Sequence, residues 1–259
     1  MIVPEVTDWQ AEFDSAYAAM AETVQRRVWR EVYGDEHPDG IIFYSYISRG
    51  ELDRCAQELR VGAGEVFGDF GCGQGGPGLW LASRTGARYV GVDISSVALD
   101  TARAQASALG VAERAELRQG SFEASGLDTG SLDAVLTVDS LMFAPDKAAA
   151  AGELARVLRP GGRLVATTFD YDSRPAGRPP QVRDHRPVLA AAGFDVLTYA
   201  ETDDWRHRVT SIADRLLAAT AELAAESGEN PAQLHEELTE LRATVDHMRR
   251  RVFIVAERR

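Results

Sequence analysis

Short apolar segments alternate with amphipathic segments from residue 65 to residue 199, and this alternation restricts the fold more than any other feature of the sequence. The apolar segments are short and bounded by turn residues, which is typical of β-strands. The segments between them have apolar residues at helical spacing. Strands that alternate with helices form a parallel sheet covered on both faces. The predicted strands are 65–70, 88–93, 115–119, 132–138, 163–169 and 194–199, and the predicted helices are 75–84, 96–109, 146–158 and 183–192.

Further segments flank this alternation on both sides. Apolar residues at helical spacing predict one helix over 8–33, and an aromatic stretch, 41–47, precedes a helix over 49–60. After the sixth strand, apolar residues three and four apart predict a hairpin of two helices, and 252–256 form a last strand. The sequence therefore predicts an α/β fold: a doubly wound, Rossmann-like, seven-stranded and mostly parallel sheet in a single domain, 1–259.

We expect three parts within this domain. Residues 1–60 form an N-terminal helical lid, 61–200 and 251–259 form the core, and 201–250 form a helical hairpin cap inserted before the last strand. Two roles stay open for the hairpin. It is either structural packing or the face of a homodimer, or it is a lid over an active site.

Composition excludes several classes of protein. The chain has 28 basic and 40 acidic residues, a net charge of −12, which argues against nucleic acid or an anionic membrane surface as partner. No apolar run approaches the roughly 20 residues of a membrane span, and the N-terminus lacks the pattern of a secretory signal. The only cysteines, Cys55 and Cys72, make no disulfide framework, and no Cys/His cluster indicates a metal. We expect a cytoplasmic protein.

A glycine-rich segment follows the first strand of the alternation. Gly71, Gly73 and Gly76 match the G-x-G-x-x-G pattern of dinucleotide sites, and Asp93 stands where a ribose-binding acid is expected. However, Asp69 precedes the first glycine by two positions. Its carboxylate would repel a pyrophosphate and suits a cationic group, such as an ammonium or a sulfonium. This favours a cationic ligand over a nicotinamide cofactor.

With these features the sequence resembles the class I S-adenosylmethionine-dependent methyltransferases over about residues 60–200 and the last strand. Five motifs occur in the family's order: DFGCGQGG at 69–76, GVDISS at 91–96, QGSFE at 119–123, VDSLMFAPDK at 138–147 and LRPGGR at 158–163.

The resemblance implies S-adenosyl-L-methionine as cofactor and S-adenosyl-L-homocysteine as its product. Asp93 would bind the ribose hydroxyls, and Ile94 would pack on the adenine. Ser121 and Phe122 would flank the adenine edge. Many family members have an acidic residue where Ser121 stands, so adenine contacts here would rest more on backbone groups and on Phe122. The methionine and ribose side would be lined by Asp69, Gly71, Cys72, Gly73 and Gly75, with Asp139 as a further cofactor contact.

The acceptor pocket is expected outside the C-terminal ends of the strands. Sequence position brings Met142, Phe143, Tyr171 and Trp205 to that rim, and the stretch containing Tyr44 and Tyr46 resembles a lid of small-molecule methyltransferases. These aromatic side chains suit an apolar or aromatic acceptor. The alternative is that they are core residues.

Two residues are candidates for a general base. His207 lies where the hairpin leaves the rim, and Asp139 follows the fourth strand, close to the transferred methyl group in relatives. Asp139 is otherwise a cofactor contact or a helix cap. An amine acceptor needs no strong base, and we expect no metal.

The sequence thus predicts a methyltransferase that acts on a nitrogen, oxygen or carbon nucleophile of a small, aromatic or apolar specialised metabolite. The alternative is a protein of this fold that binds the cofactor but catalyses another reaction, such as a cyclisation, or acts as a non-catalytic partner. A nicotinamide-dependent reductase is a third interpretation.

Overall fold

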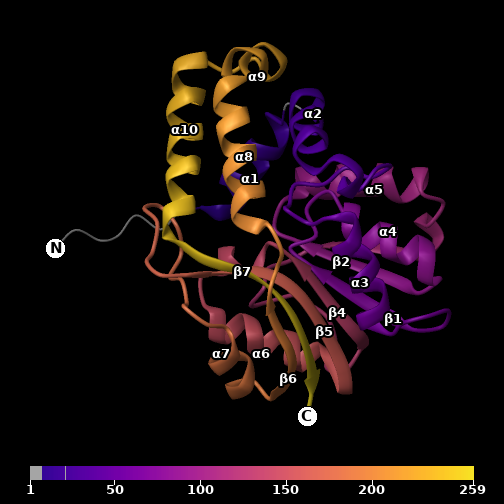
Figure 1. Cartoon of the computed structure of the whole chain (residues 1–259). Helices are drawn as coiled ribbons and strands as arrows, with labels where there is room; N and C mark the ends of the chain where they lie inside the picture. The colour runs from indigo at the N-terminus through magenta and orange to yellow at the C-terminus, as the bar shows by residue number, and fades with distance from the viewer. Residues whose placement is uncertain (1–7, 21) are drawn as a thin grey trace.

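The structure, a computed structural model, describes residues 8–20 and 22–259. Its centre is a seven-stranded sheet of order β3-β2-β1-β4-β5-β7-β6, so the predicted mostly parallel sheet is confirmed (Figure 1). Only β7 runs antiparallel to its neighbours, β5 and β6. The strands are β1 (Val66–Phe70), β2 (Arg88–Asp93), β3 (Ala115–Gln119), β4 (Leu132–Val138), β5 (Leu158–Tyr171), β6 (Phe194–Glu201) and β7 (Met248–Arg258).

Helices cover both faces of this sheet, as the apolar strands require. On one face, α3 (Arg49–Leu59), α4 (Gly76–Thr85) and α5 (Ser96–Ala108) pack on residues such as Phe67 and Leu136. On the other face, α6 (Lys147–Val157) and α7 (Arg186–Ala191) pack on Val135 and Leu164. The strand order reverses beside β1, so the C-terminal ends of β1 and β4 border the crevice where ligands of such sheets bind.

The single helix predicted over 8–33 is wrong, because the structure has two helices there. The first, α1 (Trp9–Ala18), lies against α5, whereas α2 (Glu22–Tyr33) packs against α8 (Trp205–Ala218) and α9 (Thr220–Ser227). The two helices pack against different partners, and this division is not visible in the spacing of apolar residues. A short 3₁₀ turn, η1 (Gly34–Glu36), follows α2.

Three helices, rather than the predicted two, stand between β6 and β7. They are α8, α9 and α10 (Pro231–Thr244), and Figure 1 shows α8 and α10 side by side above the sheet. Val28 and Trp29 of α2 share a buried cluster with Ile212 and Leu216 of α8. The N-terminal segment and the insertion therefore form one helical layer over the C-terminal end of the sheet.

The remaining short turns are η2 (Ala112–Arg114), η3 (Leu141–Phe143) and η4 (Val245–His247). Within the described residues, no helix has both the length and the apolar character needed to cross a membrane.

Candidate active site

The glycine-rich loop after β1 has the backbone geometry that only glycine adopts easily. Gly71, Gly73 and Gly75 have φ angles of 66°, 51° and 81°. The Gly71 N–H donates to the Val92 carbonyl over 2.8 Å, which ties the loop to the end of β2. A Cβ atom at Gly71 would lie 2.6 Å from the Ser140 side chain. These glycines let the loop turn tightly between β1 and the start of α4.

Asp93 ends β2 beside this loop. Its carboxylate accepts hydrogen bonds from the Gly73 N–H over 2.6 Å and from the Ser95 N–H over 2.9 Å. Burial raises the pKa of Asp93 from its ordinary value. The two N–H donors fix the carboxylate at the edge of the cavity described below, where it is placed to accept from ligand hydroxyls.

Asp69 is more deeply buried, with 2% of its surface exposed. Burial raises its pKa to about 8, against which hydrogen bonds from the Tyr89 hydroxyl and the Gly78 N–H act only in part. The nearby charge of Asp93 adds to the rise. A buried carboxyl of this kind gains a favourable partner when a positive group binds next to it.

A cavity of about 260 Å³ opens in front of these residues. A second hollow, of about 30 Å³, continues it over the glycine-rich loop. The larger cavity is lined by the predicted residues Gly71, Asp93, Ile94, Ser121, Phe122, Asp139, Phe143 and Tyr44. The smaller one is lined by Asp69, Cys72 and Gly73, again with Gly71 and Tyr44. Gly75 is absent from both linings, since its role is to turn the chain against Leu79.

Helix α1 supplies a wall of the larger cavity that the sequence analysis missed. Trp9, Phe13 and Tyr17 are spaced four apart, so they share one face of α1, and all three line the cavity. Asp14 fastens the helix, because its carboxylate accepts from the Ser95 hydroxyl over 2.6 Å. The four-residue spacing of these aromatic residues is visible in the sequence, but the same spacing is typical of a helix that packs on a protein core.

Glu123 is the second missed residue. It lines the cavity next to Ser121, whose hydroxyl is already engaged with the N–H groups of Glu123 and Ala124. The Glu123 carboxylate accepts only one long hydrogen bond, 3.3 Å from the Asp146 N–H. An acidic group is therefore present on this side of the cavity, two residues after the position where relatives of the family carry it.

Asp139 lines the cavity, but its carboxylate is held in a buried ion pair. Arg251 approaches both carboxylate oxygens, at 2.9 and 3.1 Å, and the Tyr46 N–H donates to one of them over 2.8 Å. Arg251 also donates to Glu51 over 2.6 Å. Asp139 has a left-handed φ of 49°, a strained value that these contacts hold in place. The expected role as general base does not fit, because a carboxylate so engaged is not free to accept a proton.

The other candidate base, His207, does not reach the cavity. It is exposed on α8, its ring lies 3.5 Å from the Ser211 hydroxyl, and it is not among the residues that line either hollow. Its position follows from α8 itself, which turns Trp205 and Val209 inward and thereby turns His207 to solvent.

The predicted acceptor residues divide into two groups. Tyr44 (47% exposed) and Phe143 face the cavity. Met142, Tyr171 and Trp205 are buried together with Phe169, and Tyr46 packs on that cluster. The Trp205 indole N–H donates to Glu201 over 2.7 Å. This second group forms the packed wall behind the cavity, as the core alternative for the aromatic residues predicts.

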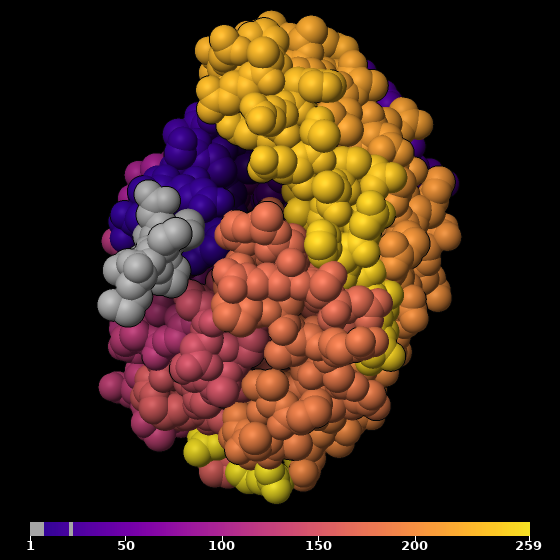
Figure 2. Space-filling view, turned by 90° about the vertical axis from the view of Figure 1, so that its left-hand side faces the viewer, coloured from indigo at the N-terminus to yellow at the C-terminus, as the bar shows by residue number. Residues whose placement is uncertain are grey.

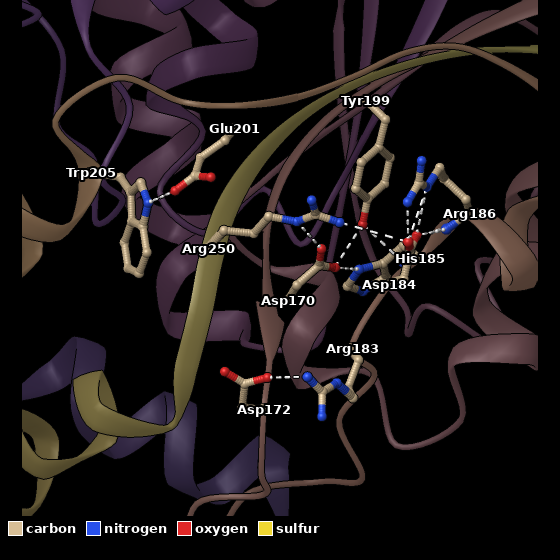
Figure 3. A network of polar contacts seen from close by, with 10 residues as sticks. All are labelled: Asp170, Asp172, Arg183, Asp184, His185, Arg186, Tyr199, Glu201, Trp205 and Arg250. Carbon is tan, nitrogen blue, oxygen red and sulfur yellow. Dashed lines mark hydrogen bonds and ion pairs between the residues drawn. The ribbon is translucent and has the colours of Figure 1, made fainter.

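A separate polar network lies on the α7 face of the sheet (Figure 3). Asp170 is wholly buried and accepts hydrogen bonds from the His185 ring over 2.9 Å, the Tyr199 hydroxyl over 2.6 Å and Arg250 over 2.7 Å. Burial alone would raise the pKa of Asp170, but these hydrogen bonds outweigh it and hold the pKa below its ordinary value. Arg250 and Arg251 are consecutive in β7, so their side chains point to opposite faces of the sheet. Arg250 pairs with Asp170 on one face, and Arg251 pairs with Asp139 on the other.

Within the described part of the chain, no group of three or more His, Cys, Asp or Glu side chains is arranged to hold a metal ion.

Comparison with known proteins agrees with this geometry. Residues 68–166 match a family model described as a methyltransferase domain. This match runs from β1 into β5, so it contains the glycine-rich loop, Asp93 and the end of β4.

Individual relatives cover only parts of the chain. The methyltransferase GfsG of Streptomyces halstedii is 36% identical over 109 residues, which are 42% of this chain and 39% of GfsG. The chloroplastic tocopherol O-methyltransferase of Arabidopsis thaliana is 35% identical over 167 residues, 58% of this chain and 48% of that enzyme. The chain thus spans less than half the length of these curated relatives.

Solved structures agree with the fold over the whole chain. The crystal structure of the [4+2]-cyclase SpnF superposes with a TM-score of 0.76 at 20% identity, covering 100% of this chain and 97% of SpnF. At this level of identity the similarity concerns the fold alone.

The residues present fit S-adenosylmethionine, the cofactor of the family. The glycine-rich loop lines the smaller hollow, and Tyr17 of α1 lies directly against it, since a Cβ at Gly73 would be 2.4 Å from the Tyr17 hydroxyl. Asp93 suits ribose hydroxyls, and Asp69 suits a positive group. Phe122 and Ile94 line the apolar side of the cavity, which suits a flat base.

Proposed function

We propose that this protein transfers a methyl group from S-adenosylmethionine to a nitrogen, oxygen or carbon nucleophile of a small, aromatic or apolar molecule. One observation carries the proposal. The cofactor residues Asp69 and Asp93 border a cavity whose remaining wall is aromatic: Trp9, Phe13, Tyr17, Tyr44 and Phe143. The similarity to a tocopherol O-methyltransferase supports a small-molecule acceptor.

The protein's own contribution is binding, orientation and exclusion of water. S-adenosylmethionine, when bound, supplies a methyl group on a positively charged sulfur. Asp93 and the glycine-rich loop would hold the cofactor, while the aromatic wall would orient the acceptor and keep water out. We propose that α1 and residues 41–47 act together as the lid, because Tyr17 and Tyr44 both line the hollow over the glycine-rich loop.

The first test is calorimetric titration with S-adenosylhomocysteine, with NADH as the control ligand. We expect S-adenosylhomocysteine to bind and NADH not to bind. The Asp93→Ala variant is expected to bind at least about tenfold more weakly, because it loses charge-assisted hydrogen bonds to the ribose hydroxyls. Asp100→Ala is the matched control, since Asp100 is exposed and pairs only with Arg103 on α5. A folded Asp93→Ala protein with unchanged affinity would rule out the ribose contact.

A second test addresses the adenine side of the cavity. Glu123→Gln is expected to weaken S-adenosylhomocysteine binding by about three- to tenfold, because the carboxylate loses its bond to the adenine amino group. S-inosylhomocysteine lacks that amino group, so its binding should not fall in the variant. Glu116→Gln, on the exposed side of β3, is the control. Equal losses for both ligands would show that Glu123 acts on the shape of the turn instead.

The second candidate is a protein of this fold that catalyses another reaction, such as a cyclisation; SpnF, which shares the fold, is a [4+2]-cyclase. A protein of this kind would bind the cofactor and an apolar acceptor without transferring a methyl group. Stoichiometric formation of S-adenosylhomocysteine in the presence of an acceptor distinguishes methyl transfer from this alternative.

A further inference from the structure

The segment between β5 and α7 brings an arginine to the aromatic wall of the cavity. The Arg178 guanidinium carbon lies 4.9 Å from the centre of the Phe143 ring, and Phe143 lines the cavity. On its other side, the Phe143 ring packs against Phe13 of α1, with 5.2 Å between the ring centres. Arg178 is only partly exposed. A guanidinium stacked on a ring keeps its N–H donors available in its own plane.

The positive charge of Arg178 acts on two nearby tyrosines, Tyr44 and Tyr171. Desolvation raises the pKa of both Tyr44 and Tyr171, the latter to about 12, and the positive charge of Arg178 opposes each rise. Tyr44 keeps almost half of its surface open to the cavities, yet enough protein surrounds it for desolvation to act. The guanidinium therefore stacks on Phe143 and is close enough for its charge to act on both tyrosines; Tyr44 and Phe143 line the cavity, whereas Tyr171 is packed behind it.

Arg178 has no acidic partner among residues 8–20 and 22–259, where its guanidinium contacts only the Phe143 ring. The arginines that follow in the same segment differ. Arg183 pairs with Asp172 at 2.7 Å, and Arg186 pairs with Asp184. Arg84 and Arg208 likewise stack on aromatic rings without an ion pair in the described residues, but their rings, Trp80 and Tyr33, do not line the cavity. The position of Arg178 suits an anion that arrives with a ligand.

The segment is held so that Arg178 and Phe143 keep their relative position. Lys147, the only lysine of the chain, is buried and donates to the carbonyls of Met142, Ala144 and Pro180 over 2.7–3.0 Å. Gln181 also donates to the Met142 carbonyl, over 3.0 Å. These bonds join the turn after β4 to the segment after β5. Figure 2 shows the surface hollowed where the indigo N-terminal helices, this salmon segment and α10 meet.

We propose that Arg178 binds an anionic group, a carboxylate or a phosphate, of the acceptor, so that the substrate is a small aromatic or apolar acid. The inference rests on the proposed function, since it names the class of molecule that enters the same cavity. The aromatic wall takes the apolar body of the acceptor, and the Arg178 guanidinium takes its charged end.

The test compares three probes of the same shape: naphthoate, naphthyl phosphate and uncharged naphthamide. Each is titrated by calorimetry into the protein saturated with S-adenosylhomocysteine. We expect at least one of the two anions to bind about tenfold more tightly than the amide, and the stronger of the two identifies the carboxylate or the phosphate as the recognised group. Arg178→Met should bring the probes to within about twofold of one another, and Arg178→Lys should keep part of the preference.

Arg183→Met is the matched control, because it removes an arginine of the same segment that already has a partner. It should leave the preference for the anion unchanged. S-adenosylhomocysteine binding by each variant reports that the fold is intact and tests the proposed function separately. No binding of either anion by the wild-type protein, equal binding of all three probes, or a preference that survives in Arg178→Met would each overturn the inference.

Discussion

The Arg251→Met variant is expected to unfold with a free energy about 3–5 kcal/mol below that of the wild-type protein. Arg251 is 2% exposed and forms buried ion pairs with Asp139 and Glu51, 2.9 and 2.6 Å away. Removing the guanidinium leaves the carboxylates of Asp139 and Glu51, whose side chains are 2% and 15% exposed, without their positive partner. The left-handed backbone of Asp139 also loses the contact that holds it. Urea unfolding at neutral pH measures the loss.

Two further variants make this experiment specific. Arg103→Met removes an exposed pair with Asp100 and should change the free energy of unfolding by less than about 0.5 kcal/mol. Arg251→Met combined with Asp139→Asn should recover part of the loss, because one unpaired charge is removed with its partner. If Arg251→Met alone is within about 1 kcal/mol of the wild-type protein, the ion pair does not hold the end of β4.

The same ion pair shows what sequence reasoning predicts and what it misses. The sheet, its strand boundaries near the glycine-rich loop and many residues that line the two hollows were predictable, because each depends on motifs of residues close together in the chain. The pairing of Arg251 with Asp139 joins residues that are 112 positions apart. The strand predicted over 252–256 extends over Met248–Arg258 in the structure. A run of arginines before Val252 is typical of a loop, and the sequence does not show that Arg250 and Arg251 have buried acidic partners.

The aromatic residues illustrate a second limit. Phe143 and Trp205 have the same chemistry, and both lie near the C-terminal rim of the sheet. Only Phe143 faces the cavity, whereas Trp205 packs with Phe169 inside the wall. The direction of each side chain depends on how α8 and the turn after β4 pack on the sheet. The spacing of apolar residues along the sequence does not determine that packing.

Cofactor binding is expected to strengthen with pH between about pH 6 and pH 8, by at least about tenfold, because of Asp69. Its pKa of about 8 lies above the ordinary value of 3.8, so the carboxyl is mostly protonated in the cofactor-free protein near neutral pH. By itself this carboxyl contributes stability to the fold that is fully present below about pH 3.8 and is lost as the pH rises to about 8. A positive group of the cofactor favours the carboxylate, lowers the pKa of Asp69 and releases a proton on binding. The affinity therefore increases until Asp69 is ionised in the free protein as well.

Calorimetric titration of the protein with the cofactor, in two buffers of different ionisation enthalpy, measures both the affinity for the cofactor and the release of a proton on binding. Asp69→Asn should bind with little dependence on pH, while the surface control Asp100→Asn should behave as the wild-type protein. The largest proton release is expected near pH 7, where Asp69 is still mostly protonated before binding. A flat profile in the wild-type protein would mean that the positive end of the cofactor does not lie next to Asp69. Asp69 would then serve the fold, as the hydrogen-bond partner of the Tyr89 hydroxyl beneath α4.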